Sequence, residues 1–215
     1  MKIFKILVAF ILLLPALSGC QSASLSGLAA RSGAILFWDN FSNASGNWPQ
    51  ISGPDGSLGI VDGQYRSQVL KSQFQMLATP GHAFRDARLE VNARRMSGPL
   101  QNLFGLACRA LDANNYYFFA ISSDGYYALG KIKGGQPALI GQSMMAYQAA
   151  ILPGEAANHL RLDCIGARLT GSVNGQEVAS GEDADFTSGQ AGLVAGALDQ
   201  PGMDVAFDNF VVYKP

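Results

Sequence analysis

The chain has 215 residues, of which 15 are Lys or Arg and 16 are Asp or Glu, so its formal net charge at pH 7 is −1. This balance excludes the basic face that nucleic-acid binding normally requires. Charged residues make up only 14% of the chain, and 25 residues are glycine. Such a composition indicates a compact, turn-rich β protein rather than a disordered one.

The first segment has the pattern of an export signal. Lys2 and Lys5 precede an uncharged run at residues 6–17, and small residues follow that run. A membrane-spanning helix needs about 20 apolar residues, and this run is shorter. We therefore expect residues 1–19 to be a signal peptide; an uncleaved anchor is the alternative.

The end of this leader, Leu17-Ser18-Gly19-Cys20, resembles the lipobox of bacterial lipoproteins. The resemblance implies cleavage before Cys20, acyl chains on Cys20, and a membrane partner. The expected localisation is exported and lipid-anchored to the bacterial cell envelope, on the cytoplasmic membrane or an outer membrane. An ordinary secretory signal with a chance cysteine is the alternative.

The next segment, residues 20–34, is expected to carry the lipidated cysteine and a flexible tether. Residues 21–32 are Ser, Ala, Gly, Leu and Gln with one Arg. A flexible segment of this length has a typical reach of roughly 20 Å. We therefore expect one domain, at residues 35–215, held close to a membrane.

Residues 35–215 have the pattern of strands and turns. Asp-Gly, Gly-Gly and Asn-Gly dipeptides, which suit tight hairpins, separate short apolar or alternating segments. One short helix is expected at residues 144–152. The fold class predicted is all-β, a two-sheet antiparallel sandwich or jelly roll, with a closed barrel as the alternative. The expected strands are residues 35–41, 64–70, 74–78, 87–94, 103–109, 116–121, 126–132, 138–142, 159–165, 169–173, 191–195 and 205–213.

Several of these segments resemble concanavalin A-like lectin and glucanase domains, including the laminin G-like and 3-keto-disaccharide hydrolase-type members. The resemblance covers residues 35–213 and implies two packed antiparallel sheets. It specifies architecture only, because binding and catalysis vary between members of that superfamily. The segments that carry it are Phe37-Trp38-Asp39-Asn40-Phe41, Gly46-Asn47-Trp48, Asn158-His159-Leu160-Arg161-Leu162, Val173-Asn174-Gly175, Ser188-Gly189-Gln190-Ala191-Gly192-Leu193 and Asp208-Asn209-Phe210-Val211-Val212.

Two cysteines remain after Cys20. Cys108 and Cys164 each lie in an expected strand, in phase with apolar neighbours. An oxidising, exported location favours a disulfide between them. Two buried reduced thiols are the alternative.

The acidic residues do not form a recognisable catalytic pair, so no catalytic residue is assigned. Retaining and inverting glycosidases need two carboxylates beside the scissile bond, and the Glu-x-Asp-x-x-Glu strand of laminarinase-type enzymes is absent from the sequence. Asp183 and Asp185 have suitable spacing but lie in an acidic segment that reads as a solvated loop, or less readily as a calcium loop. His82 and His159 are too few for a zinc site. No cofactor is expected, with structural calcium as the weaker alternative.

The aromatic hairpin at residues 114–131 is the candidate ligand surface. If Asp124-Gly125 forms a two-residue turn, Tyr116, Tyr127 and Lys131 lie on the face opposite the core, together with Phe118. Aromatic rings with polar tips can stack on sugars. Alternatively, these rings cover a strand that is buried on both faces. Arg109, Arg161 and Asp163 are also expected to point away from the core, where they could border a groove.

The sequence thus predicts an envelope lipoprotein whose β-sandwich binds carbohydrate or another envelope polymer without catalysis. Two alternatives stay open. One is a glycan-processing hydrolase of the 3-keto-disaccharide hydrolase type, and the other is a protein-interaction module of the envelope.

Overall fold

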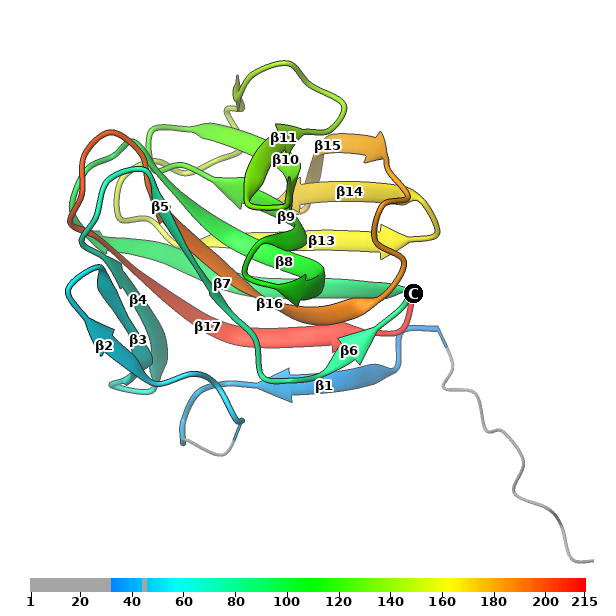
Figure 1. Cartoon of the computed structure of the whole chain (residues 1–215), viewed down its shortest axis with the longest axis horizontal. Coiled ribbons are helices and arrows are strands. Elements are labelled where there is room, and N and C mark those ends of the chain that lie inside the picture. Colours follow the sequence, from blue (N-terminus) through cyan, green and yellow to red (C-terminus); the bar gives the residue numbers. More distant parts are fainter. Residues whose placement is uncertain (1–31, 44–45) are drawn as a thin grey trace, which may run out of the picture.

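The computed structural model describes residues 32–43 and 46–215 and contains seventeen strands in two sheets (Figure 1). The predicted signal peptide, Cys20 and most of the predicted tether lie outside the described residues. Within the described part of the chain, no helix has the length and apolarity needed to cross a membrane.

The first sheet has nine strands. Its order is β15-β14-β13-β7-β17-β4-β3-β2, and β1 adds to the end of β17. All of its pairings are antiparallel. Its strands are β1 (Ile35–Asp39), β2 (Ile51–Gly53), β3 (Gly56–Val61), β4 (Gln64–Val69), β7 (Ala87–Ser97), β13 (Asn158–Ile165), β14 (Arg168–Val173), β15 (Gln176–Glu182) and β17 (Met203–Tyr213).

The second sheet has eight strands. Its order is β11-β10-β9-β8-β16-β5, with β12 paired to β10 and β6 paired to β16. Its pairings are antiparallel as well. Its strands are β5 (Phe74–Ala78), β6 (Ala83–Phe84), β8 (Asn102–Asp112), β9 (Asn115–Ile121), β10 (Tyr126–Lys133), β11 (Gln136–Leu139), β12 (Ala146–Tyr147) and β16 (Gly189–Ala197).

The two sheets pack face to face around one apolar core. Alternation along the strands supplies that core: Leu89, Val91 and Ala93 of β7 are buried, while the residues between them are partly or fully exposed. This is the period of two expected for a sheet with one covered face. The predicted two-sheet antiparallel sandwich is therefore confirmed.

An aromatic cluster lies at one end of the core and contains residues from the segments 37–41 and 46–48, which resemble concanavalin A-like domains. The Asp39 carboxylate accepts hydrogen bonds from the Trp48 indole nitrogen at 3.0 Å and from the Phe41 backbone N–H at 2.7 Å. The Trp48 ring then packs edge-on against Phe41 and Phe210. A buried carboxylate thus folds the loop after β1 back over the core.

The short helix expected at residues 144–152 is wrong. That stretch contains the two-residue strand β12, followed by turns. Gln148 N–H bonds to the Gly125 carbonyl at 2.9 Å, and Tyr147 pairs with Tyr126. Backbone pairing to β10 therefore outweighs the weak local helical pattern. The expected strands also omitted β2, β3, β6 and β15.

The predicted disulfide between Cys108 and Cys164 is confirmed, with an S–S distance of 1.96 Å. Cys108 belongs to β8 of the second sheet and Cys164 belongs to β13 of the first. The bridge therefore crosses the core and joins the two layers.

Candidate functional site

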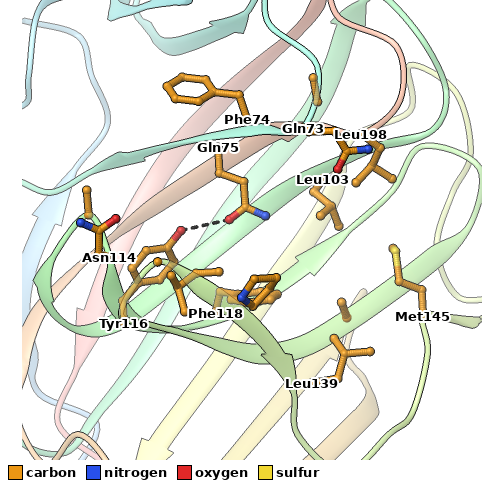
Figure 2. A pocket seen from close by; sticks show the side chains of 16 residues that line it. Gln73, Phe74, Gln75, Leu103, Asn114, Tyr116, Phe118, Leu139, Met145 and Leu198 are labelled. Atoms are coloured by element: carbon orange, nitrogen blue, oxygen red, sulfur yellow. Dashed lines mark hydrogen bonds between the residues drawn. The ribbon is translucent and has the colours of Figure 1, made fainter.

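A groove of about 430 Å³ lies on the outer face of the eight-stranded sheet (Figure 2). Its floor is formed by β8, β9 and β10, through residues such as Leu103, Phe118 and Ala128. Gln75 of β5 stands at one side, and Leu139 of β11 stands at the other. The volume falls within the range of small-molecule sites, about 300 to 1,000 Å³.

The groove has depth because small side chains occupy the centre of this face. Ala107, Ala120 and Ala128 lie on it from three neighbouring strands, and all three are buried. Gly130 lies in the same row on β10. A Cβ atom added to Gly130 would be only 2.8 Å from the Phe118 ring, so a side chain does not fit there. Larger residues at the margins therefore rise above a low floor.

The Tyr116 hydroxyl and the Gln75 amide supply polar groups next to the apolar floor. Tyr116 and Phe118 are edge-to-face, with ring centroids 6.4 Å apart. The Tyr116 hydroxyl donates to the Gln75 Oε1 atom at 3.0 Å (Figure 2). Burial raises the pKa of Tyr116 to about 12, so this hydroxyl stays a neutral donor. With Oε1 engaged, the Gln75 Nε2 group is oriented as a donor toward the groove.

The groove carries no ionic side chain among the described residues that line it. The eight strands of this sheet contain only four charged residues, Arg109, Asp112, Lys131 and Lys133, and none of them lines the groove. At one rim, Gln73 donates to the Asp199 carboxylate at 2.7 Å. The arrangement is that of an apolar groove with amide and hydroxyl groups for orientation.

Two exposed tyrosines adjoin the groove. Tyr126 lies two residues from Ala128 on the same strand, so both side chains share a face. Its ring stacks edge-on against Tyr147 of β12, with centroids 5.8 Å apart, and Tyr147 is 65% exposed. This pair offers accessible ring surface, whereas Tyr116 and Phe118 are buried in the floor.

The outer face of the other sheet has a contrasting, charged character. Asp163 pairs with Arg161 on its own strand and with Arg88 on β7, and Arg66 pairs with Asp204. A separate hollow of about 360 Å³ on this face is lined by polar side chains that include Asn92 and Asp208. Arg161 and Asp163 therefore lie on the opposite side of the molecule from the groove. Their ion pairing raises the pKa of Arg161.

Tyr127 and Lys131 lie on the face opposite to the one predicted. Ile121 pairs with Tyr127, and Tyr117 pairs with Lys131, because the turn contains five residues between the paired positions rather than the two of Asp124-Gly125. A one-residue change of register moves every side chain to the other face. Tyr127 consequently packs against the core, and Lys131 points between the sheets.

Lys131 meets two carboxylates there. Its ammonium group is paired with Asp183 and Asp185, which follow β15 of the other sheet. The hydrogen bonds that the Lys131 ammonium group donates to the two carboxylates raise the pKa of Lys131. The acidic segment is therefore held by Lys131 and Lys133 rather than simply solvated. No group of three or more His, Cys, Asp or Glu side chains is placed to hold a metal ion within residues 32–43 and 46–215.

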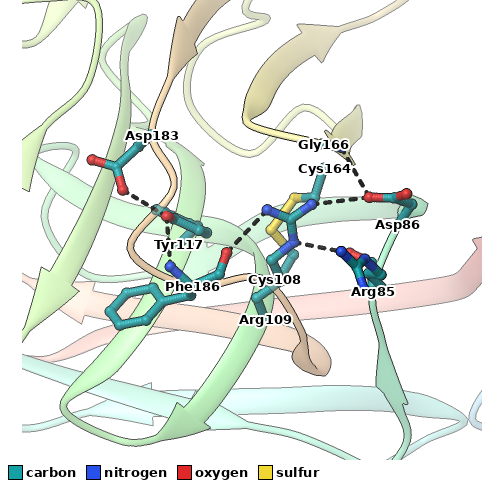
Figure 3. Close-up of a disulfide and its surroundings, with 9 residues drawn as sticks. All are labelled: Arg85, Asp86, Cys108, Arg109, Tyr117, Cys164, Gly166, Asp183 and Phe186. Carbon is teal, nitrogen blue, oxygen red and sulfur yellow. Dashed lines mark hydrogen bonds and ion pairs between the residues drawn. A yellow bond between two sulfur atoms is a disulfide. The ribbon is translucent and has the colours of Figure 1, made fainter.

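Arg109 is buried, and the expectation that it points away from the core is wrong. A β-bulge after Cys108 gives Arg109 a φ of 52°, which returns its side chain to the inner side beside the disulfide (Figure 3). Its guanidinium donates to the carbonyls of Arg85 and Phe186 at 2.9 and 3.0 Å and to Asp86 at 3.1 Å. Strict alternation cannot anticipate a bulge.

Of the six residues predicted to contact a ligand, only Tyr116 lines the groove. Gln75, Tyr126 and Tyr147 were not among the predicted ligand residues. A two-residue turn at Asp124-Gly125 would place Tyr126 on the core face, and Tyr147 lies in the helix expected at residues 144–152. Gln75 had one usable signal: it is a polar residue between Phe74 and Met76 on a short apolar strand.

The order of the strands and the face-to-face packing of the sheets define a two-sheet antiparallel jelly-roll sandwich, and comparison with solved structures supports that architecture. The chain is similar to carbohydrate-binding module CBM66 from Bacillus subtilis, with a TM-score of 0.62 and 18% identity over 78% of this chain and 95% of the module. It is also similar to a protein of unknown function with a galectin-like fold from Bacillus subtilis, with a TM-score of 0.64 and 15% identity over 86% of this chain and 97% of that protein.

A third similar structure is the Bacillus licheniformis β-glucanase, with a TM-score of 0.60 and 11% identity over 87% of this chain and all of the enzyme. At these identities the likeness establishes the fold. No protein-family model matches the chain, and no curated protein matches its sequence.

Proposed function

We propose that this chain is an exported lipoprotein, anchored through Cys20, whose sandwich binds a carbohydrate chain in the groove without cleaving it. The observation that carries the binding proposal is the groove itself. It combines an apolar floor, a neutral Tyr116 hydroxyl and a free amide donor on Gln75. These are the features by which sites bind the apolar faces and the hydroxyl groups of sugars. The carbohydrate-binding module and the glucanase of similar fold support the same ligand class.

The ligand class that fits is a neutral saccharide. A carboxylate or sulfate group on the ligand would lose its hydration in this groove and find no cation among the described lining residues. Neutral hydroxyl groups can instead bond to amides such as those of Gln75 and Asn114. The exposed Tyr126 and Tyr147 rings extend the surface beyond the groove.

Binding without hydrolysis is favoured by the placement of the carboxylates. Two-carboxylate hydrolysis requires an acid on each side of the scissile bond, about 5 to 9.5 Å apart. The described residues that line the groove include no Asp or Glu. Asp183 and Asp185 lie close together, but Lys131 and Lys133 pair with them away from the groove. The hydrolase alternative therefore has less support than binding.

A glycan array that carries neutral and acidic saccharides tests the proposal, with the purified full chain as the probe. We expect neutral glycans to be retained and the Gln75→Ala variant to bind them about fivefold more weakly, because one hydrogen bond is worth about 1 kcal/mol. Tyr126→Ala should weaken binding as well. Gln68→Ala, the same change on β4 of the other sheet, is the matched control and should bind normally.

Two results would contradict the proposed binding. One is retention of acidic glycans alone, and the other is binding that is unaffected by Gln75→Ala and Tyr126→Ala. Release of reducing ends from a retained glycan would favour the hydrolase instead.

The anchor is tested separately by metabolic labelling with palmitate. The parent chain should incorporate label and the Cys20→Ser variant should not. Continued labelling of the variant would contradict acylation at Cys20.

A further inference from the structure

An exposed apolar patch lies where the chain enters the sandwich. Trp38, Leu36 and Ile35 of β1 are all exposed, Trp38 by 54%. β1 alternates between two environments, because Phe37 and Asp39 point inward to the core while Trp38 points outward. Exposed large apolar side chains that cluster on one strand mark a contact surface.

The neighbouring strand widens the patch. Val211 lies opposite Trp38, and Tyr213 lies opposite Ile35; both are partly exposed on the outer side of β17. We call these five residues, Ile35, Leu36, Trp38, Val211 and Tyr213, the entry patch. None of them is charged.

The charged residues across β17 from the entry patch already have partners. Glu90 lies opposite Val211 and Arg88 lies opposite Tyr213. Glu90 lies opposite Arg161 of β13, and Arg88 is 3.2 Å from Asp163. The patch therefore ends at a border of internally paired charges, and its own surface is apolar with the amphipathic rings of Trp and Tyr.

The position of the entry patch indicates what covers it. The chain reaches β1 from the segment that begins at Cys20, and the composition of residues 21–32 predicts a reach of roughly 20 Å. Acyl chains on Cys20 would hold this end of the sandwich next to a bilayer. Trp and Tyr are the residues enriched at the membrane–water interface, where one side of the ring is apolar and the other is hydrated.

We propose that the entry patch rests on the lipid headgroup region of the membrane that holds the anchor, so that the sandwich is oriented rather than freely tumbling. This inference rests on the proposed anchoring at Cys20. Trp38, Val211 and Tyr213 of the entry patch lie on the outer face of the nine-stranded sheet, whereas the groove lies on the outer face of the eight-stranded sheet. A membrane in contact with the entry patch therefore leaves the groove open to ligands.

Fluorescence of the two tryptophans tests this contact. The chain contains only Trp38 and Trp48, and Trp48 is buried at 5% exposure. The full lipidated chain is reconstituted into phosphatidylcholine vesicles with brominated or unmodified acyl chains. We expect brominated lipid to remove the Trp38 share of the emission, and Trp38→Phe, which retains only Trp48, to show no such loss.

A second variant distinguishes an oriented domain from one that meets the bilayer at random. Trp38→Phe combined with Tyr147→Trp moves the exposed indole to β12, next to the groove. We expect its emission to be insensitive to brominated lipid. Equal quenching of this variant and of the parent chain would overturn the proposal.

Flotation of the vesicles separates the contact from the anchor. A chain that floats with the vesicles but shows no quenching of Trp38 would overturn the entry-patch contact and leave the anchor intact. A chain that neither floats nor shows quenching would overturn both. Neither result bears on glycan binding, which is measured on the array.

Discussion

Arg109 is the residue whose environment departs most from its usual surface role. It is 3% exposed, and its guanidinium nitrogens donate to three acceptors on two segments: the Arg85 carbonyl and the Asp86 carboxylate on one, and the Phe186 carbonyl on the other. A guanidinium group has five donors in a fixed plane, so it can join several acceptors that one ammonium group cannot reach together. Arg109 thus ties the loop after β6 and the loop before β16 to the bulge in β8.

Replacement of Arg109 by Met should lower the free energy of unfolding by about 3 kcal/mol, because buried acceptors lose their donor. Arg109→Lys should recover only part of the loss. Urea unfolding followed by tryptophan fluorescence measures both variants. Arg94→Met, on the partly exposed outer face of β7, is the matched control and should change stability by less than about 1 kcal/mol. Equal stability of Arg109→Met and the parent chain would show that the network contributes little.

At the scale of elements, the segment after β15 depends on contacts from the other sheet. Lys131 of β10 pairs with Asp183 and Asp185, and the Tyr117 hydroxyl of β9 donates to Asp183 at 2.6 Å and accepts from the Phe186 N–H at 2.9 Å. Burial and the bond to Asp183 raise the pKa of Tyr117 to about 12, so its hydroxyl remains a donor at neutral pH. Two strands of one sheet therefore hold the crossover from the other.

Lys131→Met should lower the free energy of unfolding by about 1 kcal/mol at neutral pH, and the size of this loss should depend on pH. Although burial opposes the effect, hydrogen bonds from Lys131 and Tyr117 lower the pKa of Asp183 in the folded chain. The stabilisation is therefore complete above the usual carboxyl pKa of about 3.9 and is lost as the pH falls through the lowered pKa of Asp183.

At high pH, the stabilisation by this ion pair is limited by the deprotonation of Lys131. Its pKa is raised in the folded chain, so its contribution is complete below the usual lysine pKa of about 10.4 and is lost as the pH rises through the raised value. Urea unfolding of the parent and the Lys131→Met variant at a series of pH values should give a constant difference from about pH 5 to pH 9. A difference that disappears within that range would contradict the ion pairing.

The hairpin of β9 and β10 shows why the groove was harder to predict than the sandwich. The pattern of apolar residues identifies both strands, and that pattern is local. The faces depend on how the strands are paired, and the turn shifts the pairing so that Ile121 meets Tyr127. The bulge at Arg109 has the same effect within one strand. Both features depend on backbone contacts that the pattern of residue types does not contain.

At the scale of the whole molecule, the two sheets are joined by the core, by crossover loops and by one covalent link. The apolar core and the fold class could be predicted because alternation and turn dipeptides extend along nearly the whole domain. The disulfide could be predicted because two inward-facing cysteines remain in a chain expected to be exported. Prediction of the groove would require knowing which short strands pair with each other. For example, β5 pairs with β16, although the two strands are more than a hundred residues apart in the sequence.

The disulfide gives the whole-molecule prediction. Cys108 and Cys164 are 56 residues apart in sequence and lie in different sheets, so the bridge restricts the unfolded chain and links the two layers. The double variant Cys108→Ala/Cys164→Ala should lose about 2 to 4 kcal/mol of unfolding free energy, because a loop of this length has a large closure entropy. Urea unfolding under oxidising and reducing conditions measures the effect. Reductant should destabilise the parent chain by a similar amount and leave the double variant unchanged.

Because the groove is built from β5, β8, β9 and β10 within one sheet, the folded double variant should bind glycans as the parent does. A parent chain whose stability is indifferent to reductant would show that the core alone determines how the two layers are held together.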